Sequence, residues 1–579
     1  MTAPAPDYTL GVPPRTELEL ARQQFEDLER SRSSMVPWWR ELSRFFAPRA
    51  QRFDQQAENR GNFLNRHILD ERAIDARRTC AAGLYWGVTN PSREWIQLTV
   101  PDPTLRELDD VKEWLFEVNT RLYTVLGGSN FYLTQAGANE DWITYATAAY
   151  LVEEDERDII RCVPFAGGSY GISDNARDEV TTFCRRFQLT IRQLLEQFGE
   201  RDGTGKVRVE KFSQHVRDCL KRGSLEEKVE VCHLITPNAE FDGVREATEA
   251  KQFASYYWEY GVKPEQKAQE FLRKDGYDEW PVMVFRWRRV AGEAWGIDCP
   301  AMQVLGTNKS LQAVESKSLK LVDKAVDPPL VGPSSLQNKR VSLLPGDITT
   351  DDDREKQLRA IHTVDLTALQ AVTLKQEEMR ARIDDAFYVR LMTFILSMQG
   401  KGQRTAEEIR EGSQEKYLVL GPVIESANGE YSRLVDRVFA IMVRRGLIPP
   451  APESLAGLPL KVEYTSIMAQ AQKAVGLANI ERFGYWLADM VKATGDPRMA
   501  LKVDLQQMVD EVGLRSGLPP RVVRSDDAVA EIEAAADAAA AEQARVEQGA
   551  LEARAAKDLA AAPMGNDTAL DRVVQAGAM

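Results

Sequence analysis

A short Gly-rich, basic segment interrupts two stretches of helical periodicity in the second half of this 579-residue chain. The segment, residues 398–404, reads Met-Gln-Gly-Lys-Gly-Gln-Arg. Directly after it, Thr405 and Glu408 have the spacing of a capping box, in which the Thr405 hydroxyl accepts the Glu408 backbone N–H and the Glu408 carboxylate reaches back. Before it, apolar residues recur at helical spacing: Met379, Ile383, Ala386, Phe387 and Leu391. The pattern predicts two long helices joined by a short flexible loop.

The composition of this loop suits weak contact with a passing polyanion. Gly400 and Gly402 allow the backbone to reshape at little steric cost, so we expect them to act as hinges. Contacts of Lys and Arg with phosphate are independent of sequence and sensitive to salt, which suits DNA that must slide. A solvated loop that happens to be basic is the alternative that the spacing leaves open. The candidate DNA-contacting residues are Gln399, Lys401, Gln403 and Arg404.

Length and charge limit the class of protein. A chain of 579 residues and 65.1 kDa corresponds to roughly three or four domain-sized units. The net charge of −14 argues against a polycation that coats nucleic acid. It is compatible with a protein that surrounds DNA without gripping it, because an acidic wall repels phosphate.

The sequence also predicts whether the chain is targeted to a membrane and whether its cysteines are reduced. We find no apolar run of about 18 residues, so no membrane span is expected. The N-terminus has neither the basic region nor the apolar core of a signal peptide. Scattered cysteines without a Cys-x-x-Cys pair predict reduced thiols in a protein made in the cytoplasm: Cys80, Cys162, Cys184, Cys219, Cys232 and Cys299.

Hydrophobic periodicity predicts a mainly helical α+β protein. An insert between about 160 and 290 has alternating strand-like runs and is expected to form a separate small subdomain. The Ala-rich stretch 526–562, with nine acidic and three basic residues, permits either a helix or disorder. Helices are expected at about 17–46, 66–86, 103–126, 133–147, 191–198, 209–220, 300–326, 354–397, 405–446 and 466–515. Strands are expected at about 95–98, 149–153, 229–235, 253–260 and 282–287.

The chain carries no recognisable nucleotide site or nucleophile. Lys309-Ser310 resembles the end of a P-loop, but position 308 is Asn rather than Gly. Gly203–Lys206 is followed by Val207 rather than Ser or Thr, and position 200 is Glu rather than Gly. No Gly-x-Ser-x-Gly elbow is present. We therefore predict no catalytic residues, no cofactor and no enzymatic activity.

The sequence also predicts no metal site. The four histidines, His67, His215, His233 and His362, have no helical i, i+4 pairing. Cys232 and His233 are adjacent, so in a strand their side chains point to opposite faces. The acidic run 351–353 fits the negative first turn of a following helix.

Five segments together resemble the head-to-tail connector (portal) proteins of short-tailed bacteriophages. The similarity spans roughly residues 20–520 and contains the segments in the same order. Two departures are visible: Ala294-Trp295 stands where the family usually has an aromatic residue directly followed by Gly, and 526–579 matches nothing diagnostic. The similar segments are Ala73–Leu98, Phe131–Glu153, Phe187–Gly199, Gly292–Pro329 and Arg404–Ile409.

The resemblance implies a subunit with wing, stem, clip and crown regions, of which about twelve form a ring around a DNA channel. Its boundaries would be 1–19 (flexible N-terminus), 20–184 (first part of the wing), 185–225 (stem helical segment), 226–299 (α+β clip), 300–326 (second stem helix), 327–397 (second part of the wing, with a long helix), 398–404 (channel loop), 405–465 (long helices leading to the crown), 466–525 (helical crown) and 526–579 (Ala-rich acidic tail).

The resemblance also implies partners and a location. The protein would sit at the portal vertex of a virion and serve genome packaging, retention and ejection. Its partners would be further copies of itself, double-stranded DNA bound without sequence specificity, a terminase motor, capsid and scaffolding proteins, and tail adaptor or nozzle proteins, with no membrane. Two alternatives remain. An ATP-dependent packaging motor would need the missing P-loop, and a scaffold that forms no ring would differ in oligomer size.

Overall fold

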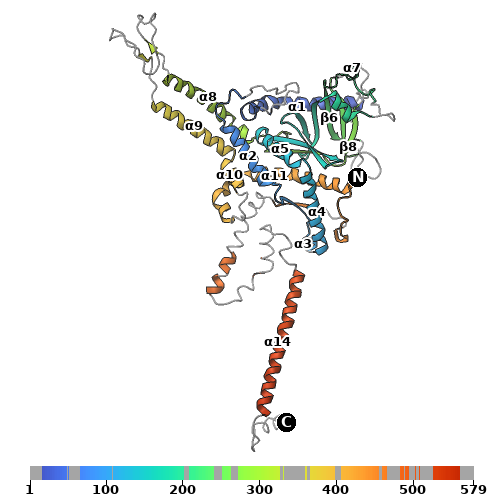
Figure 1. The fold of residues 1–579 in the computed structure, drawn as a ribbon, viewed down its shortest axis with the longest axis vertical. Coiled ribbons are helices and arrows are strands. Elements are labelled where there is room, and N and C mark those ends of the chain that lie inside the picture. Colours follow the sequence, from blue (N-terminus) through green and yellow to red (C-terminus); the bar gives the residue numbers. More distant parts are fainter. Residues whose placement is uncertain are drawn as a thin grey trace, which may run out of the picture. The chain divides into compact units, whose positions relative to one another are not determined.

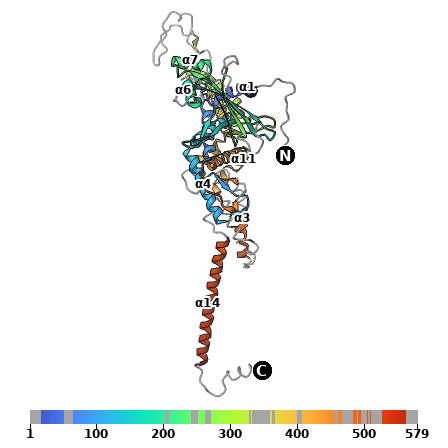
Figure 2. The same cartoon turned by 90° about the vertical axis from the view of Figure 1, so that its right-hand side faces the viewer.

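The chain divides into two compact units, residues 1–106 with 113–475, and residues 107–112 with 476–579. Figure 1 and Figure 2 give two views of the ribbon. The computed structural model describes residues 16–48, 50, 65–106, 108–200, 208–239, 251–261, 271–326, 330–331, 359–360, 366–397, 406–455, 460–465, 483–487, 489–493, 503, 508 and 526–560.

Most of the larger unit is built from helices whose ends follow local sequence signals. Helix α1 has a capping box formed by Thr16 and Glu19, and α6 has one formed by Thr190 and Gln193. The helices are α1 (Glu17–Phe46), α2 (Arg72–Val88), α3 (Pro103–Arg106), α4 (Asp109–Gly128), α5 (Phe131–Tyr145), α6 (Ile191–Phe198), α7 (Gln214–Arg222), α8 (Pro300–Val326), α9 (Leu366–Ala386), α10 (Val389–Ser397) and α11 (Ala406–Arg444).

The described strands form four antiparallel sheets, with orders β4-β5-β6-β7-β8, β3-β2-β9, β1-β12 and β10-β11. In the largest sheet, Cys184 pairs with Leu234 and Leu234 with Tyr256. The strands are β1 (Ile96–Thr99), β2 (Thr147–Asp155), β3 (Ile159–Pro164), β4 (Tyr170–Asp174), β5 (Val180–Thr190), β6 (Lys228–Pro237), β7 (Phe253–Glu259), β8 (Arg273–Tyr277), β9 (Val282–Arg286), β10 (Leu330–Val331), β11 (Arg359–Ala360) and β12 (Lys461–Tyr464).

The five-stranded sheet shares its core with helix α1, which lies outside the predicted insert, so the expectation of a separate subdomain is wrong. On one face, Phe25 of α1 packs edge-on against Trp258 of β7 at 5.4 Å between ring centroids. On another part of the sheet, α6 and α7 cover β6 and β7 (Figure 2). The shared apolar contacts join the insert to the N-terminal helix.

Three predicted helical segments are shorter than expected. Residues 185–190 belong to β5, so the 185–225 segment is helical only in α6 and α7. Helix α7 starts at Gln214 because the Ser213 side chain caps it, which leaves Val209 and Phe212 ahead of the helix. The predicted helix 354–397 begins only at Leu366 and is broken between α9 and α10, where Tyr388 has a φ of 54°.

The smaller unit contains a helix, α14 (Asp526–Ala560), whose described side chains are nearly all exposed. The Ala-rich composition therefore gives helix rather than disorder here, since Ala and Glu favour helix without any packing partner. Of the predicted crown, residues 483–487 and 489–493 are helical, and the remainder of 466–515 lies almost entirely outside the described residues.

Candidate assembly surface and channel site

A helical hairpin extends from the body of the larger unit. Helices α8 and α9 lie side by side, and at the end away from the sheets β10 pairs with β11 through Leu330–Ala360 and Val331–Arg359 (Figure 1). From Ala313 onward, no residue of α8 is buried. The outer part of the hairpin therefore receives little packing from its own subunit.

This outer part nevertheless remains apolar on one face. Leu319, Val322 and Val326 are spaced i, i+3 and i+7, which places them on one side of α8. Their exposed fractions are 50%, 41% and 81%, and Leu374 on α9 is 67% exposed. Apolar side chains gathered on an exposed surface mark protein interaction sites. We call these four exposed apolar residues of the hairpin, three on one face of α8 and one on α9, the hairpin surface.

The opposite face of the outer α8 is basic. Lys317, Lys320 and Lys324 have the same i, i+3, i+7 spacing, roughly opposite the apolar residues around the helix, and all three are exposed. The outer half of α8 thus has one face suited to burial against protein and one face suited to contact with anions.

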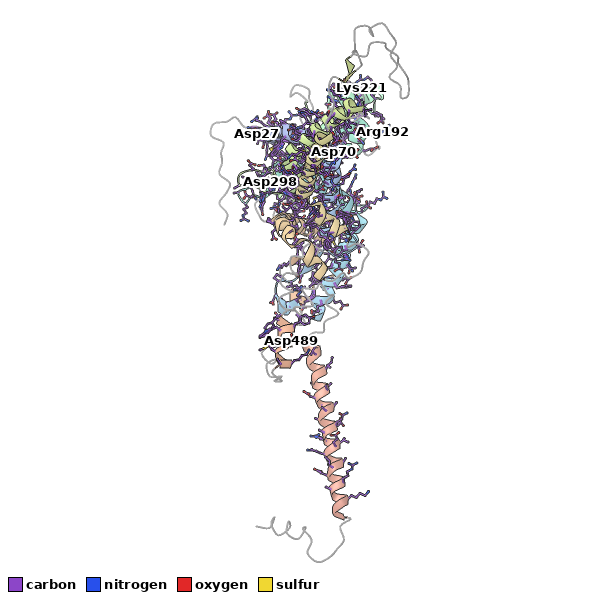
Figure 3. The ribbon with its side chains drawn as sticks, turned by 90° about the vertical axis from the view of Figure 1, so that its left-hand side faces the viewer. Asp27, Asp70, Arg192, Lys221, Asp298 and Asp489 are labelled. Carbon is purple, nitrogen blue, oxygen red and sulfur yellow. The ribbon has the colours of Figure 1, made fainter. Side chains whose placement is uncertain are left out.

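A polar network fixes the base of the hairpin. Gln312 of α8 accepts the backbone N–H groups of Leu69 and Asp70 at 2.7 and 3.0 Å, and donates to the Asp70 carbonyl at 2.9 Å. Arg380 of α9 reaches the buried Asp70 carboxylate at 2.7 Å. Asp70 (Figure 3) therefore connects the segment before α2 with both helices of the hairpin.

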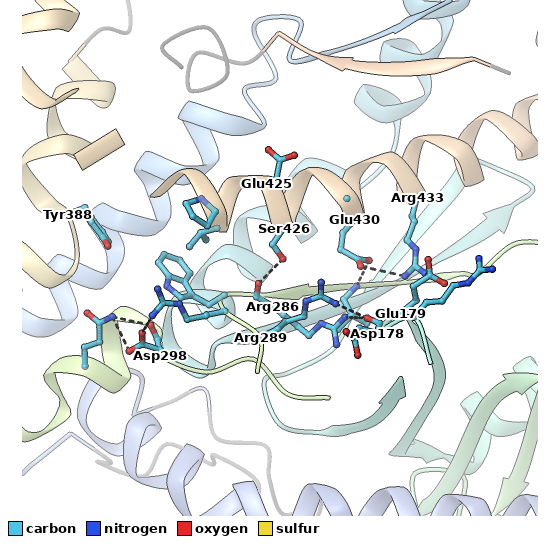
Figure 4. A pocket seen from close by; sticks show the side chains of 18 residues that line it. Asp178, Glu179, Arg286, Arg289, Asp298, Tyr388, Glu425, Ser426, Glu430 and Arg433 are labelled. Atoms are coloured by element: carbon cyan, nitrogen blue, oxygen red, sulfur yellow. Dashed lines mark hydrogen bonds and ion pairs between the residues drawn. The ribbon is translucent and has the colours of Figure 1, made fainter. Parts of the chain in front are cut away.

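A charged groove of about 810 Å³ lies where α11 crosses the end of β9. Its walls also come from the β4–β5 turn, the start of α8 and Tyr388 (Figure 4). Three non-glycine residues with positive φ line it, Asp178, Asp298 and Tyr388, so the backbone is sharply turned at its rim. Five arginines and five carboxylates contribute to the lining: Arg177, Arg286, Arg288, Arg289, Arg433, Asp178, Glu179, Asp298, Glu425 and Glu430.

Several of these charges are already paired with one another or with a carboxylate beside the groove. Arg286 is 4% exposed and lies 2.5 Å from Asp174, and Arg288 lies 2.7 Å from Asp298. Burial raises the pKa of Glu430, whose carboxylate accepts the Val284 N–H at 3.2 Å and lies 3.5 Å from Arg433. Because charges of both signs are paired here, we interpret this groove as a structural contact between α11 and β9 rather than as a catalytic site.

The predicted channel loop lies between α10 and α11, outside the residues that the structure describes. Helix α10 ends at Ser397 and α11 begins at Ala406. Gln399, Gly400, Lys401, Gly402, Gln403, Arg404 and Thr405 lie outside the described residues, as does the side chain of Glu408. The loop contacts, its hinges and the helix cap therefore stay predictions.

Comparison with known proteins identifies the family. Residues 18–523 match the family described as bacteriophage head to tail connecting protein. The chain belongs to this family. A portal protein of Salmonella phage epsilon15 is 34% identical over 516 residues, which is 88% of this chain and 89% of that protein. A probable portal protein of Bordetella phage BPP-1 is 31% identical over 523 residues, 90% of this chain and 91% of that protein.

The chain is accordingly a phage head-to-tail connector, or portal protein, a structural component of the virion and not an enzyme. The resemblance predicted from sequence segments is confirmed. Two solved structures are also similar to this chain, at much lower sequence identity. The virion of a native gene transfer agent particle gives a TM-score of 0.33 at 8% identity, covering 74% of this chain and 90% of that chain. The neck of an empty gene transfer agent particle gives 0.32 at 10%, covering 75% and 94%.

The part of the connector that the structure describes contains no helix long and apolar enough to cross a membrane.

All six cysteines are free and buried. Cys232 packs toward α1, while His233 stacks on Tyr257 and lies 3.0 Å from the Ser255 hydroxyl, so the two side chains do point to opposite faces.

Proposed function

We propose that this connector closes into a ring of about twelve subunits around a DNA channel, with the α8–α9 hairpins side by side as the stem. The observation that carries the proposal is the hairpin surface. A subunit that exposes Leu319, Val322, Val326 and Leu374 on a projecting element gains free energy by covering them. A neighbouring copy is the occupant that a portal ring supplies.

This proposal moves the stem and clip from the regions that the sequence resemblance implied. Residues 185–225 hold a strand and two short helices packed on the sheet, which supports placing them in the wing together with 226–299. Helix α9 replaces that segment as the second stem helix, beside α8. The clip then begins at the β10–β11 pair, and it is the part that would meet the terminase motor and later the tail adaptor.

The basic face of α8 supports a further assignment within the ring. With the hairpin surface turned toward a neighbouring subunit, Lys317, Lys320 and Lys324 are free to face the channel. Their contact with phosphate would be weak and sensitive to salt. The acidic remainder of the chain would limit the binding of DNA to the channel, because it repels phosphate. Packaging, retention and ejection of the genome would all pass through this channel.

The mass of the purified protein tests the ring directly. Native mass spectrometry, combined with negative-stain images of the same sample, should show a species near twelve times 65.1 kDa with a central hole wide enough for DNA. A monomer or dimer at every salt concentration would contradict the ring and favour a scaffold that forms no ring.

A further inference from the structure

Three potential metal ligands converge beside the five-stranded sheet. His215 and Cys219 are four residues apart in α7 and share one helix face, and Glu227 directly precedes β6. His215 Nε2 lies 3.8 Å from Cys219 Sγ and 3.2 Å from a Glu227 oxygen, and Cys219 Sγ lies 3.0 Å from the other Glu227 oxygen. Among the residues that the structure describes, this is the only such group of three.

These separations are close to those of a bound ion. Standard zinc bond lengths to sulfur, nitrogen and oxygen in a tetrahedron separate the ligand atoms by about 3.4–3.6 Å. The observed distances differ from this by about 0.2–0.6 Å. The two Glu227 contacts use different carboxylate oxygens, and with one ligand atom from each residue the three atoms lie within 4.8 Å of one another. The His215 and Glu227 side chains are 55% and 41% exposed, so small rotations of both can complete the geometry.

We infer that His215, Cys219 and Glu227 bind a divalent transition metal ion of the zinc class. A thiolate and a carboxylate supply two negative charges, which balance the charge of the ion, and the sulfur–imidazole combination favours zinc over magnesium or calcium. Water fills the fourth position, because solvent reaches the site past His215 and Glu227. The ion ties α7 to the start of β6.

The protein framework around the site is already fixed by packing. Cys219 is fully buried and belongs, with Val216, to the apolar cluster that includes Val229 and Val231 of β6. Without metal, the Cys219 thiol donates a hydrogen bond to Glu227 at 3.0 Å. Metal replaces the thiol proton, which leaves to solvent. The exposed Arg222 guanidinium, 3.2 Å from the sulfur, moves aside.

The alternative is a hydrogen-bonded network that holds no ion. To distinguish the two, metal is removed from the full-length protein with a chelator, the protein is titrated with Co²⁺ and Zn²⁺, and bound metal is measured by elemental mass spectrometry. We expect about one ion per chain and a thiolate-to-cobalt charge-transfer band in the Co²⁺ form. Cys219→Ser should remove the band, and His215→Gln or Glu227→Gln should weaken binding at least about tenfold.

Two variants serve as controls. Asp218→Asn removes a carboxylate of α7 outside the site, and His67→Gln removes a half-buried histidine elsewhere, so both should bind the ion as the wild type does. Absence of stoichiometric metal in the wild type, or unchanged binding and an unchanged cobalt spectrum in Cys219→Ser, would overturn the inference. The readout is independent of ring assembly, so the failure of the ring proposal would leave it untouched.

Discussion

Arg380 on α9 donates to the carboxylate of Asp70, which lies just before α2, and both its Nε and a terminal nitrogen reach the same oxygen at 2.8 and 2.7 Å. The Asp70 side chain is only 6% exposed, whereas that of Arg380 is 38% exposed. This pair lies 310 residues apart in sequence and joins the hairpin base to the N-terminal helices.

Replacing Arg380 by Ala should therefore loosen the hairpin. The change leaves a buried carboxylate with fewer donors, and we expect a loss of about 1–3 kcal/mol in the free energy of unfolding. Urea denaturation of the purified subunit measures this. Arg382→Ala on the same helix is the matched control, because Arg382 is 62% exposed and pairs with Glu378 within its own helix, so its loss should stay below about 0.5 kcal/mol. Equal losses in the two variants would show that the contact of Arg380 with Asp70 stabilises the subunit no more than the exposed ion pair of Arg382 does.

Leu319→Glu should block ring formation while the subunit still folds. The substitution places a charge on the hairpin surface, where desolvation in an interface is costly, but Leu319 is half exposed in the subunit and contributes little to its core. Native mass spectrometry should show monomer, and circular dichroism should be unchanged. Leu20→Glu on α1 is the control, since Leu20 has a similar exposed fraction of 53%. Rings of normal size in Leu319→Glu would rule out this surface as the subunit contact.

Gly296→Ala should destabilise the protein strongly. A Cβ at position 296 would lie 2.1 Å from the Ala146 carbonyl oxygen, which is backbone and cannot rotate away. The same oxygen accepts the Trp287 N–H, so a shift also disturbs β9. We expect a cost of about 1–3 kcal/mol. Gly306→Ala in α8 meets open space, and it should instead be neutral or stabilise by up to about 1 kcal/mol. Thermal unfolding compares the two, and an unchanged midpoint for Gly296→Ala would contradict the contact.

Asp141 should give the protein a component of stability that falls as pH rises. Burial raises the pKa of its carboxyl from 3.8 to about 7, opposed by Arg77 and by the Gly167 N–H that donates to it at 2.9 Å. Between these pH values the folded state keeps a proton that the unfolded state loses. The contribution is therefore complete below about pH 4 and declines, by on the order of 1.4 kcal/mol per pH unit, until about pH 7.

Asp141→Asn removes this proton linkage. The stability of the variant, measured by urea denaturation at a series of pH values from 4 to 8, should fall less steeply between pH 4 and pH 7 than that of the wild type. Identical slopes for the two proteins would mean that Asp141 titrates normally in the folded state.

The double variant Lys401→Ala, Arg404→Ala tests the channel loop. If these cations touch the DNA backbone, their removal should change the length or retention of the packaged genome while rings still assemble. Pulsed-field electrophoresis of DNA from purified particles measures the length. Unchanged length and retention in particles with normal rings would dismiss a role for the loop bases.

Local sequence signals predicted much of the helical framework. Helix α1 was expected at residues 17–46 and α6 at 191–198, and both have these bounds, because a capping box and an apolar stripe involve neighbours in the chain. Strands β6 and β9 were recognised from alternation for the same reason. Segments in a fixed order along the chain also indicate the connector family.

A pattern of paired histidines does not include the proposed metal ligands, because the helical i, i+4 pair is His215 with Cys219. That spacing is visible in the sequence. The third ligand is not, because Glu227 reaches the pair only after α7 turns back at Gly223 onto the sheet.

The sequence by itself determined the bounds of helices such as α1 and α6 and the family to which the chain belongs, because both depend on residues close together or in fixed order. The tertiary structure decided that residues 185–190 pair as a strand, that the helix expected from 354 starts at Leu366, and that Asp70 meets Arg380. Each of these depends on which distant segment supplies a hydrogen-bond partner or covers an apolar face, and a one-dimensional pattern does not encode that choice.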